Sequence, residues 1–237
     1  MEQEEMMLSA AENFRIVKER IAEAEYKAGR QPGSVRLVAV TKFVETDRIA
    51  QAIAAGALEV GENRAQELTD KYDFFREHGQ TIHFIGALQL NKVKYLVGKA
   101  DLIQSADRPE AFAEISRLAS KRGLVQDTLA EVNIGSEPQK SGVEPSCLGE
   151  LLTRISDMPG VRCRGLMCIP PAAGGKGSAY YFARMKELFE SMKGLALPKV
   201  EMSILSMGMS GDYTSAIAVG ADMVRVGSAI FGPRARH

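Results

Sequence analysis

Eight short apolar runs, separated by stretches of helical periodicity, constrain the fold of this chain more than any other feature. Several runs are apolar at successive positions instead of alternating, which is typical of strands covered on both faces in a parallel sheet. The runs span residues 36–40, 57–60, 81–85, 101–104, 128–134, 163–169, 200–205 and 222–226. Strand and helix are therefore predicted to alternate along the chain.

The helical stretches number seven after the first strand, and many end near a glycine. They span residues 47–56, 64–77, 91–99, 108–122, 146–157, 178–193 and 211–219. An eighth helix is predicted in the opening segment, beside the last strand, from the helical spacing of Phe14, Val17, Ile21 and Ala24. This count predicts an α/β fold: a single (β/α)8 TIM-like barrel with an extra N-terminal helix, in one domain over residues 1–237. A doubly wound open sheet usually has fewer strands, about five to seven.

Charge and cysteine content narrow the class of protein. Thirty basic side chains balance thirty acidic ones, so the chain lacks the single-sign charge typical of partners of nucleic acid or membranes. Three cysteines without C-x-x-C spacing argue against a zinc site or a disulfide framework. The first residues are acidic, and no apolar run approaches the roughly 18 residues of a membrane span. We expect a cytoplasmic protein.

Lys42 follows the first predicted strand by two residues. The carboxyl ends of barrel strands present catalytic and ligand-binding groups, and a primary amine there can form an imine with a carbonyl compound. A lysine that simply reaches solvent at a strand end is the alternative. A loop at 170–177 follows the sixth strand on the same face, but Lys176 is followed by Gly177 and not by the hydroxyl residue of a phosphate-binding P-loop.

Two further features favour a phosphate-bearing ligand. The segments 206–212 and 227–232 follow the seventh and eighth strands, where such barrels often bind phosphate, and they are rich in serine and glycine. Turn and N-cap roles are the alternative for each serine. Arg225 lies inside the last apolar run, so its charge needs an acceptor: a buried carboxylate or a ring nitrogen of a ligand. An amine, a phosphate cradle and a ring partner together predict pyridoxal 5'-phosphate (PLP), with Lys42 forming the internal aldimine.

Four motifs carry a resemblance to a known family. They are 37–42 (LVAVTK), 61–63 (GEN), 83–92 (HFIGALQLNK) and 206–212 (SMGMSGD), and the segments 140–142 and 224–232 fit as well. In this order they resemble the YggS/PROSC family of PLP homeostasis proteins over nearly the whole chain. The resemblance implies a barrel like the N-terminal domain of alanine racemase, and it implies a monomer.

The resemblance also implies roles for individual residues. Lys42 would bind the cofactor, Arg225 would face the pyridine nitrogen, and Asn63 would lie beside the ring. The phosphate would lie at Ser210, Gly227 and Ser228, and Met207 is expected among the cofactor-binding residues. Lys140 would act in cofactor exchange, or be a solvated loop lysine. His83 is interpreted as a core histidine whose ring forms hydrogen bonds with the backbone, and this role is preferred over a catalytic one. Thr41, Phe43 and Arg64 depart from the residues that many relatives carry beside Lys42 and Asn63.

The function expected from the resemblance is PLP binding in intracellular PLP homeostasis, by buffering or delivery, without turnover of a substrate. PLP-dependent apoenzymes are candidate recipients. The chain ends five residues after Gly232, which is expected to leave no room for the second domain of a racemase. A PLP-dependent amino-acid racemase stays open as the alternative, although no tyrosine is nominated as an opposing base, and so does an aldolase that uses Lys42 directly on a sugar phosphate. No metal is expected.

Overall fold

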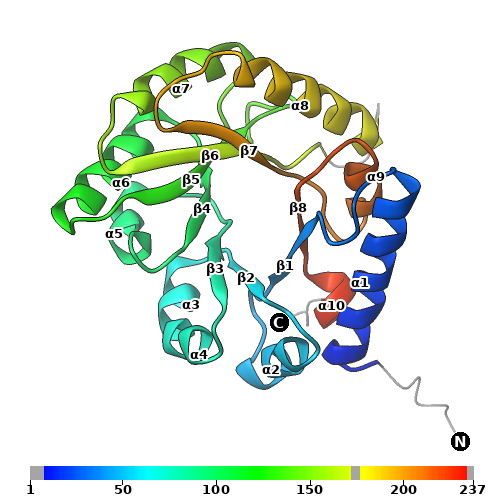
Figure 1. The fold of residues 1–237 in the computed structure, drawn as a ribbon. Helices are drawn as coiled ribbons and strands as arrows, with labels where there is room; N and C mark the ends of the chain where they lie inside the picture. Colours follow the sequence, from blue (N-terminus) through cyan, green and yellow to red (C-terminus); the bar gives the residue numbers. More distant parts are fainter. Residues whose placement is uncertain (1–7, 172–176, 234–237) are drawn as a thin grey trace, which may run out of the picture.

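The computed structural model describes residues 8–171 and 177–233, and its eight parallel strands close into a barrel in sequence order (Figure 1). Each strand pairs with the next one, and β8 returns to pair with β1. The strands are β1 (Arg36–Val40), β2 (Glu59–Glu62), β3 (Thr81–Phe84), β4 (Leu102–Ala106), β5 (Gln126–Val132), β6 (Val161–Cys168), β7 (Val200–Ser206) and β8 (Met223–Val226). Every predicted apolar run overlaps one of them, which confirms the predicted barrel.

Helices surround the barrel on the outside (Figure 1). They are α1 (Ala10–Lys27), α2 (Thr46–Ala54), α3 (Ala65–Asp70), α4 (Tyr72–Glu77), α5 (Val93–Leu96), α6 (Pro109–Lys121), α7 (Leu148–Ser156), α8 (Gly177–Lys193), α9 (Tyr213–Ala218) and α10 (Ser228–Phe231), with short 3-10 turns at Leu90–Lys92 and Pro145–Cys147. Part of the predicted loop 170–177, residues 172–176, lies outside the described residues.

The extra helix predicted at the N-terminus is α1. Ser9 and Glu12 form a reciprocal capping box that fixes its start. The helix packs against α2, α9 and α10, and Asn13 Nδ2 donates to Ile230 O over 3.1 Å. It therefore completes the outer ring of helices where β8 meets β1, with α10 as its link to the last strand (Figure 1).

Three helices differ from the prediction. The stretch 64–77 forms two helices because the chain leaves helical geometry at Lys71, which has φ −95° and ψ 0°. The stretch 91–99 is helical only as far as Leu96 and turns at Gly98, which has φ +76°. Helix α10 was not predicted, since four residues are too few to show a helical period.

Apolar side chains form two cores. The larger one lies between the strands and the helices, and α1 contributes Phe14, Val17 and Ile21 to it. The smaller one consists of Val38, Leu102, Leu129, Met167, Ile204 and Met223, one layer of apolar side chains from six strands. Several buried polar side chains also come from the strands, among them His83, Gln104, Ser206 and Arg225. The inside of this barrel is thus only partly apolar.

Candidate active site at the carboxyl ends of the strands

Lys42 lies in the turn after β1, with its side chain partly buried. In the parallel register Val40 pairs with Gly61, and Thr41 N donates to Gly61 O over 3.0 Å. Continuing this register by two residues brings Asn63 alongside Lys42. The lysine thus stands at the carboxyl end of β1, as predicted, next to the end of β2.

The residue before Lys42 is held by a buried acid and a lysine. Thr41 Oγ1 donates to Glu62 Oε1 over 2.7 Å, and Lys71 Nζ lies 2.9 Å from both that carboxylate oxygen and Thr41 O. Burial raises the pKa of Glu62, while the nearby ammonium of Lys71 opposes the shift. The break in the helix at Lys71 therefore places its ammonium group at the ends of β1 and β2, beside Thr41 and Glu62.

The residue after Lys42 is held as well. Phe43 N donates to Glu67 Oε2 over 2.7 Å, and Phe43 has φ +59°, a left-handed conformation that a bulky residue rarely adopts. The guanidinium of Arg64 lies 4.6 Å from the centre of the Phe43 ring. Both neighbours of Lys42 are thus held by side chains from β2 and α3. Arg64 and Phe43, two of the residues that differ from those of many relatives, lie against each other.

Arg225 is buried inside the barrel near its carboxyl end. Its Nη1 donates to Ser206 Oγ over 2.6 Å and its Nη2 to Cys168 O over 2.8 Å. Burial lowers the pKa of this guanidinium, but an arginine starts so high that it stays charged. Its acceptors here are a hydroxyl and a carbonyl, and not the buried carboxylate that was the alternative.

Glu131 is a buried acid that sequence reasoning missed. Burial raises its pKa to about 7; the negative charge of Asp107 adds to the shift, and Arg225 opposes it. This carboxyl therefore changes charge near neutral pH. Its signal in the sequence is a lone glutamate inside the apolar run 128–134.

The serine and glycine loops after β7 and β8 meet, as predicted. Ser210 Oγ accepts hydrogen bonds from the backbone N–H groups of Gly227 and Ala229, each over 3.2 Å, at the start of α10. Ser228 is exposed beside them as the first residue of that helix. Asp212 turns its carboxylate to Met209 N over 2.7 Å, which fixes the preceding loop.

This cluster adjoins the end of β1. A Cβ placed on Gly227 would lie 3.2 Å from Val40 Cβ, so the two strand ends touch. The end of β1, two residues before Lys42, thus lies between the end of β2, which leads into Asn63, and the end of β8, which leads into the Gly227–Ser228 turn.

Asn63 has a buried Oδ1 for which the described residues provide no hydrogen-bond partner. Its backbone is held close to Gly86, where an added Cβ would lie 1.9 Å from Asn63 O. Only glycine allows this approach. Met207 differs from the other predicted site residues because its side chain is fully buried in the outer core, and its backbone N–H donates to Met223 O over 3.1 Å.

Two further residues singled out in the sequence have defined partners. His83 is a core histidine, as interpreted, but its neighbours are side chains and not the backbone: Gln104 Nε2 forms a hydrogen bond with Nδ1 over 2.9 Å, and Glu59 Oε2 lies 3.0 Å from Nε2 at ion-pair distance. Lys140 pairs with Glu137 and donates to Pro170 O over 3.2 Å, so it bridges the loops after β5 and β6.

Residues 12–235 match the family model described as the N-terminal domain of alanine racemase, so the barrel is of that class. The crystal structure of alanine racemase from Corynebacterium glutamicum has the same fold, with a TM-score of 0.72 at 15% identity over 95% of this chain and 61% of that one.

Closer relatives define the family within this class. The chain is 41% identical over 231 residues to the pyridoxal phosphate homeostasis protein of Aquifex aeolicus, which covers 96% of this chain and 99% of the relative. PipY of Synechococcus elongatus, solved with PLP bound, superposes with a TM-score of 0.78 at 33% identity over 90% of this chain and all (100%) of that one. The chain belongs to the family of pyridoxal phosphate homeostasis proteins, as the resemblance in its motifs indicated.

No helix among the described residues has the length and apolar content to cross a membrane. Within the same residues, no group of three or more His, Cys, Asp or Glu side chains is placed to hold a metal ion.

Proposed function

We propose that this protein binds PLP through Lys42 and serves PLP homeostasis by buffering or delivering the cofactor. The observation that carries the proposal is that β1, which leads into Lys42, ends between β2, which leads into Asn63, and β8, which leads into the Gly227–Ser228 turn, at the barrel end near which Arg225 lies buried. The names of the relatives and the PLP bound to PipY support it.

The residues around Lys42 fit this cofactor. PLP supplies an aldehyde that reacts with a primary amine, and a ring that can withdraw electrons. Lys42 provides the amine, and the buried, unpartnered Oδ1 of Asn63 is an acceptor that a ligand's donor can satisfy. Ser210 and Ser228 provide hydroxyl groups for a phosphate beside Gly227, and the Gly227 and Ala229 N–H groups that now donate to Ser210 Oγ would exchange that acceptor for a phosphate oxygen. The backbone of Met207 lies in the adjoining strand end.

Arg225 supports binding over turnover. Because a guanidinium only donates hydrogen bonds and stays charged, a pyridine nitrogen that faces it remains an unprotonated acceptor. Such a ring stabilises carbanions poorly, so we infer that the protein is not primarily an enzyme. An amino-acid racemase is the second candidate, because the fold is that of the alanine racemases and Lys42 could serve as one base.

Absorption spectroscopy tests the proposal. Purified protein mixed with PLP is expected to gain an absorption band that survives gel filtration and is lost in Lys42→Ala. Lys18→Ala, which removes an exposed lysine of α1, is the matched control and should keep the band. Protein that ignores added PLP would refute the proposal.

Two assays, one for each candidate function, distinguish PLP homeostasis from racemisation. The loaded protein is expected to restore activity to a PLP-dependent apoenzyme and to leave L-alanine unracemised. Sustained racemisation of an amino acid, abolished in Lys42→Ala, would replace the homeostasis proposal with the racemase.

A further inference from the structure

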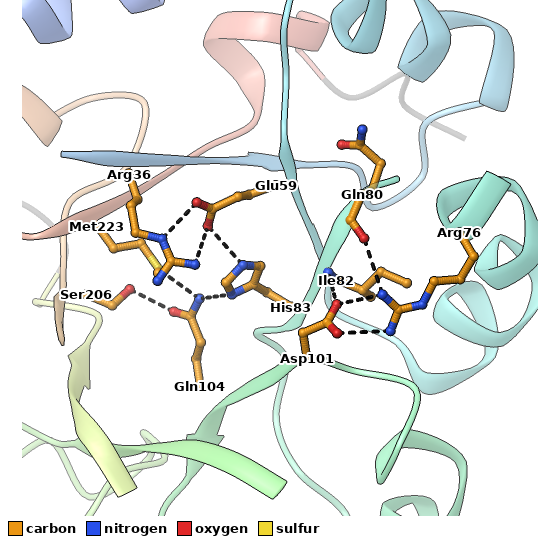
Figure 2. A network of polar contacts seen from close by, with 10 residues as sticks. All are labelled: Arg36, Glu59, Arg76, Gln80, Ile82, His83, Asp101, Gln104, Ser206 and Met223. Carbon is orange, nitrogen blue, oxygen red and sulfur yellow. Dashed lines mark hydrogen bonds and ion pairs between the residues drawn. The ribbon is translucent and has the colours of Figure 1, made fainter. Parts of the chain in front are cut away.

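A line of side chains links Arg225 to a carboxylate across the inside of the barrel. Arg225 reaches Ser206 Oγ over 2.6 Å, Ser206 Oγ lies 2.7 Å from Gln104 Oε1, and Gln104 Nε2 lies 2.9 Å from His83 Nδ1. His83 Nε2 then lies 3.0 Å from Glu59 Oε2, at ion-pair distance without full hydrogen-bond alignment. Figure 2 shows the line from Ser206 to Glu59, whose members come from β7, β4, β3 and β2.

Burial makes each link in this line costly to lose. Arg225 is 3% exposed, and Ser206, Gln104 and His83 are each 0% exposed. A buried polar group without its partner loses the full free energy of its hydration. Each of these side chains therefore depends on the next for its hydrogen bond.

The orientation of the Gln104 amide, with Oε1 toward Ser206 and Nε2 toward His83, sets the direction of the hydrogen bonds in the line. Arginine can only donate, and an ionised carboxylate can only accept. Ser206 must accept from Arg225 and donate to Gln104 Oε1, so the Gln104 amide nitrogen must donate to His83. His83 Nδ1 must then carry a lone pair, which places the ring proton on Nε2, facing Glu59.

Two contacts outside the line agree with this direction. Gln104 Nε2 also lies 3.1 Å from Met223 Sδ, a weak acceptor, which assigns the amide nitrogen to that side (Figure 2). Arg36 holds Glu59 in a bidentate pair, with Nε to Oε1 at 2.8 Å and Nη2 to Oε2 at 2.9 Å. Glu59 is thus kept as an acceptor at the end of the line.

We propose that Ser206, Gln104 and His83, the last as its neutral Nε2–H tautomer, are positioning residues for Arg225. They orient the Ser206 lone pair toward the guanidinium and so fix where its remaining N–H groups point. The inference rests on the proposed function, because the group that those N–H groups would meet is the ring acceptor of PLP. With the opposite tautomer, the Gln104 amide would have to turn, and both Gln104 and Arg225 would donate to Ser206.

The tautomer is measured without PLP. In protein labelled with 15N-histidine, long-range proton–nitrogen correlations at neutral pH distinguish the two ring tautomers, and the His83 signals are assigned by their absence in His83→Gln. The expected result is an unprotonated Nδ1 and a protonated Nε2. A proton on Nδ1, alone or together with one on Nε2, would overturn the assigned direction.

The positioning role is measured with PLP. Ser206→Ala and Gln104→Met are expected to bind PLP about tenfold more weakly, the size of one lost hydrogen bond to a charged group, and to shift the absorption maximum of the bound cofactor. Ser203→Ala is the matched control: this serine is exposed on the same strand and donates to Arg164 O, so both readouts should stay unchanged. A shifted band is not expected from a loss of stability alone.

Folded Ser206→Ala and Gln104→Met with the wild-type affinity and band would overturn the positioning role. If Gln104→Met does not fold, Ser206→Ala alone decides, because it removes a single oxygen. Wild-type protein that binds no PLP would overturn the proposed function and with it the positioning role, while the His83 tautomer would still be decided by its own measurement.

Discussion

Arg225 donates to Ser206 Oγ over 2.6 Å, so the cation near the carboxyl end of the barrel is held by a hydroxyl of the neighbouring strand. A carboxylate in that place would neutralise the guanidinium. With a hydroxyl and the Cys168 carbonyl as its acceptors, the group keeps its charge and its capacity to donate to a ligand. Glu131 senses this charge, because the guanidinium opposes the rise in its pKa that burial causes.

Glu131 is expected to make the stability of the protein depend on pH. Its pKa is raised to about 7 in the folded protein, against roughly 4.3 in an unfolded chain, so between these values only the unfolded state loses the proton. The free energy of unfolding should therefore fall by up to about 3 kcal/mol from pH 4 to pH 8 on account of this group. Urea denaturation of wild type and Glu131→Gln across this range checks it. The variant should gain stability relative to wild type as pH rises, and parallel curves would contradict the shifted pKa.

Lys71→Met should destabilise the turn that carries Lys42. The substitution leaves Glu62, which is fully buried, with Thr41 as its remaining side-chain partner, and breaking a buried ion pair on one side costs about 3 kcal/mol. Urea denaturation should show this loss at neutral pH and a smaller one in acid, where Glu62 is protonated in both states. The double variant Glu62→Gln/Lys71→Met should recover most of the stability. A single variant as stable as wild type would show that the pair does not support the turn.

Gly86→Ala tests the close approach of the segment after β3 to Asn63. Its Cβ would lie 1.9 Å from Asn63 O, so the backbone must move, and we expect a loss of about 2 kcal/mol in the free energy of unfolding. Because the shift displaces Asn63, PLP binding should weaken as well. Gly149→Ala is the control, since an added Cβ there meets nothing within 4 Å on α7. It should be neutral or stabilising by about 0.5 kcal/mol, and equal effects of both substitutions would refute the contact.

The sequence was sufficient to predict the barrel because its strands are buried on both faces and therefore read as continuous apolar runs. It was also sufficient to bring Lys42, Asn63, Ser210 and Gly227 to one end, since parallel strands place their carboxyl ends together. The same logic does not determine which way a side chain points, which is why Met207 was expected at the site although its side chain lies in the outer core.

The partners of Arg225 and His83 could not be predicted from the sequence. Ser206, Gln104 and Glu59 belong to separate strands, far apart in the chain, and only the closure and register of the barrel bring them into line. The support of the Lys42 turn by Lys71 was hidden for a similar reason. The stretch 64–77 has the pattern of one helix. Its break at Lys71 can be explained only from the structure, in which Lys71 Nζ contacts Thr41 O and Glu62 Oε1 at the strand ends.

The most direct test of this account is the site of the covalent adduct. Protein loaded with PLP is reduced with borohydride, digested and mapped by mass spectrometry, with Lys42→Ala treated in parallel. The account predicts the adduct on Lys42 and its loss in the variant. An adduct on Lys140 or another lysine, unchanged in Lys42→Ala, would contradict it.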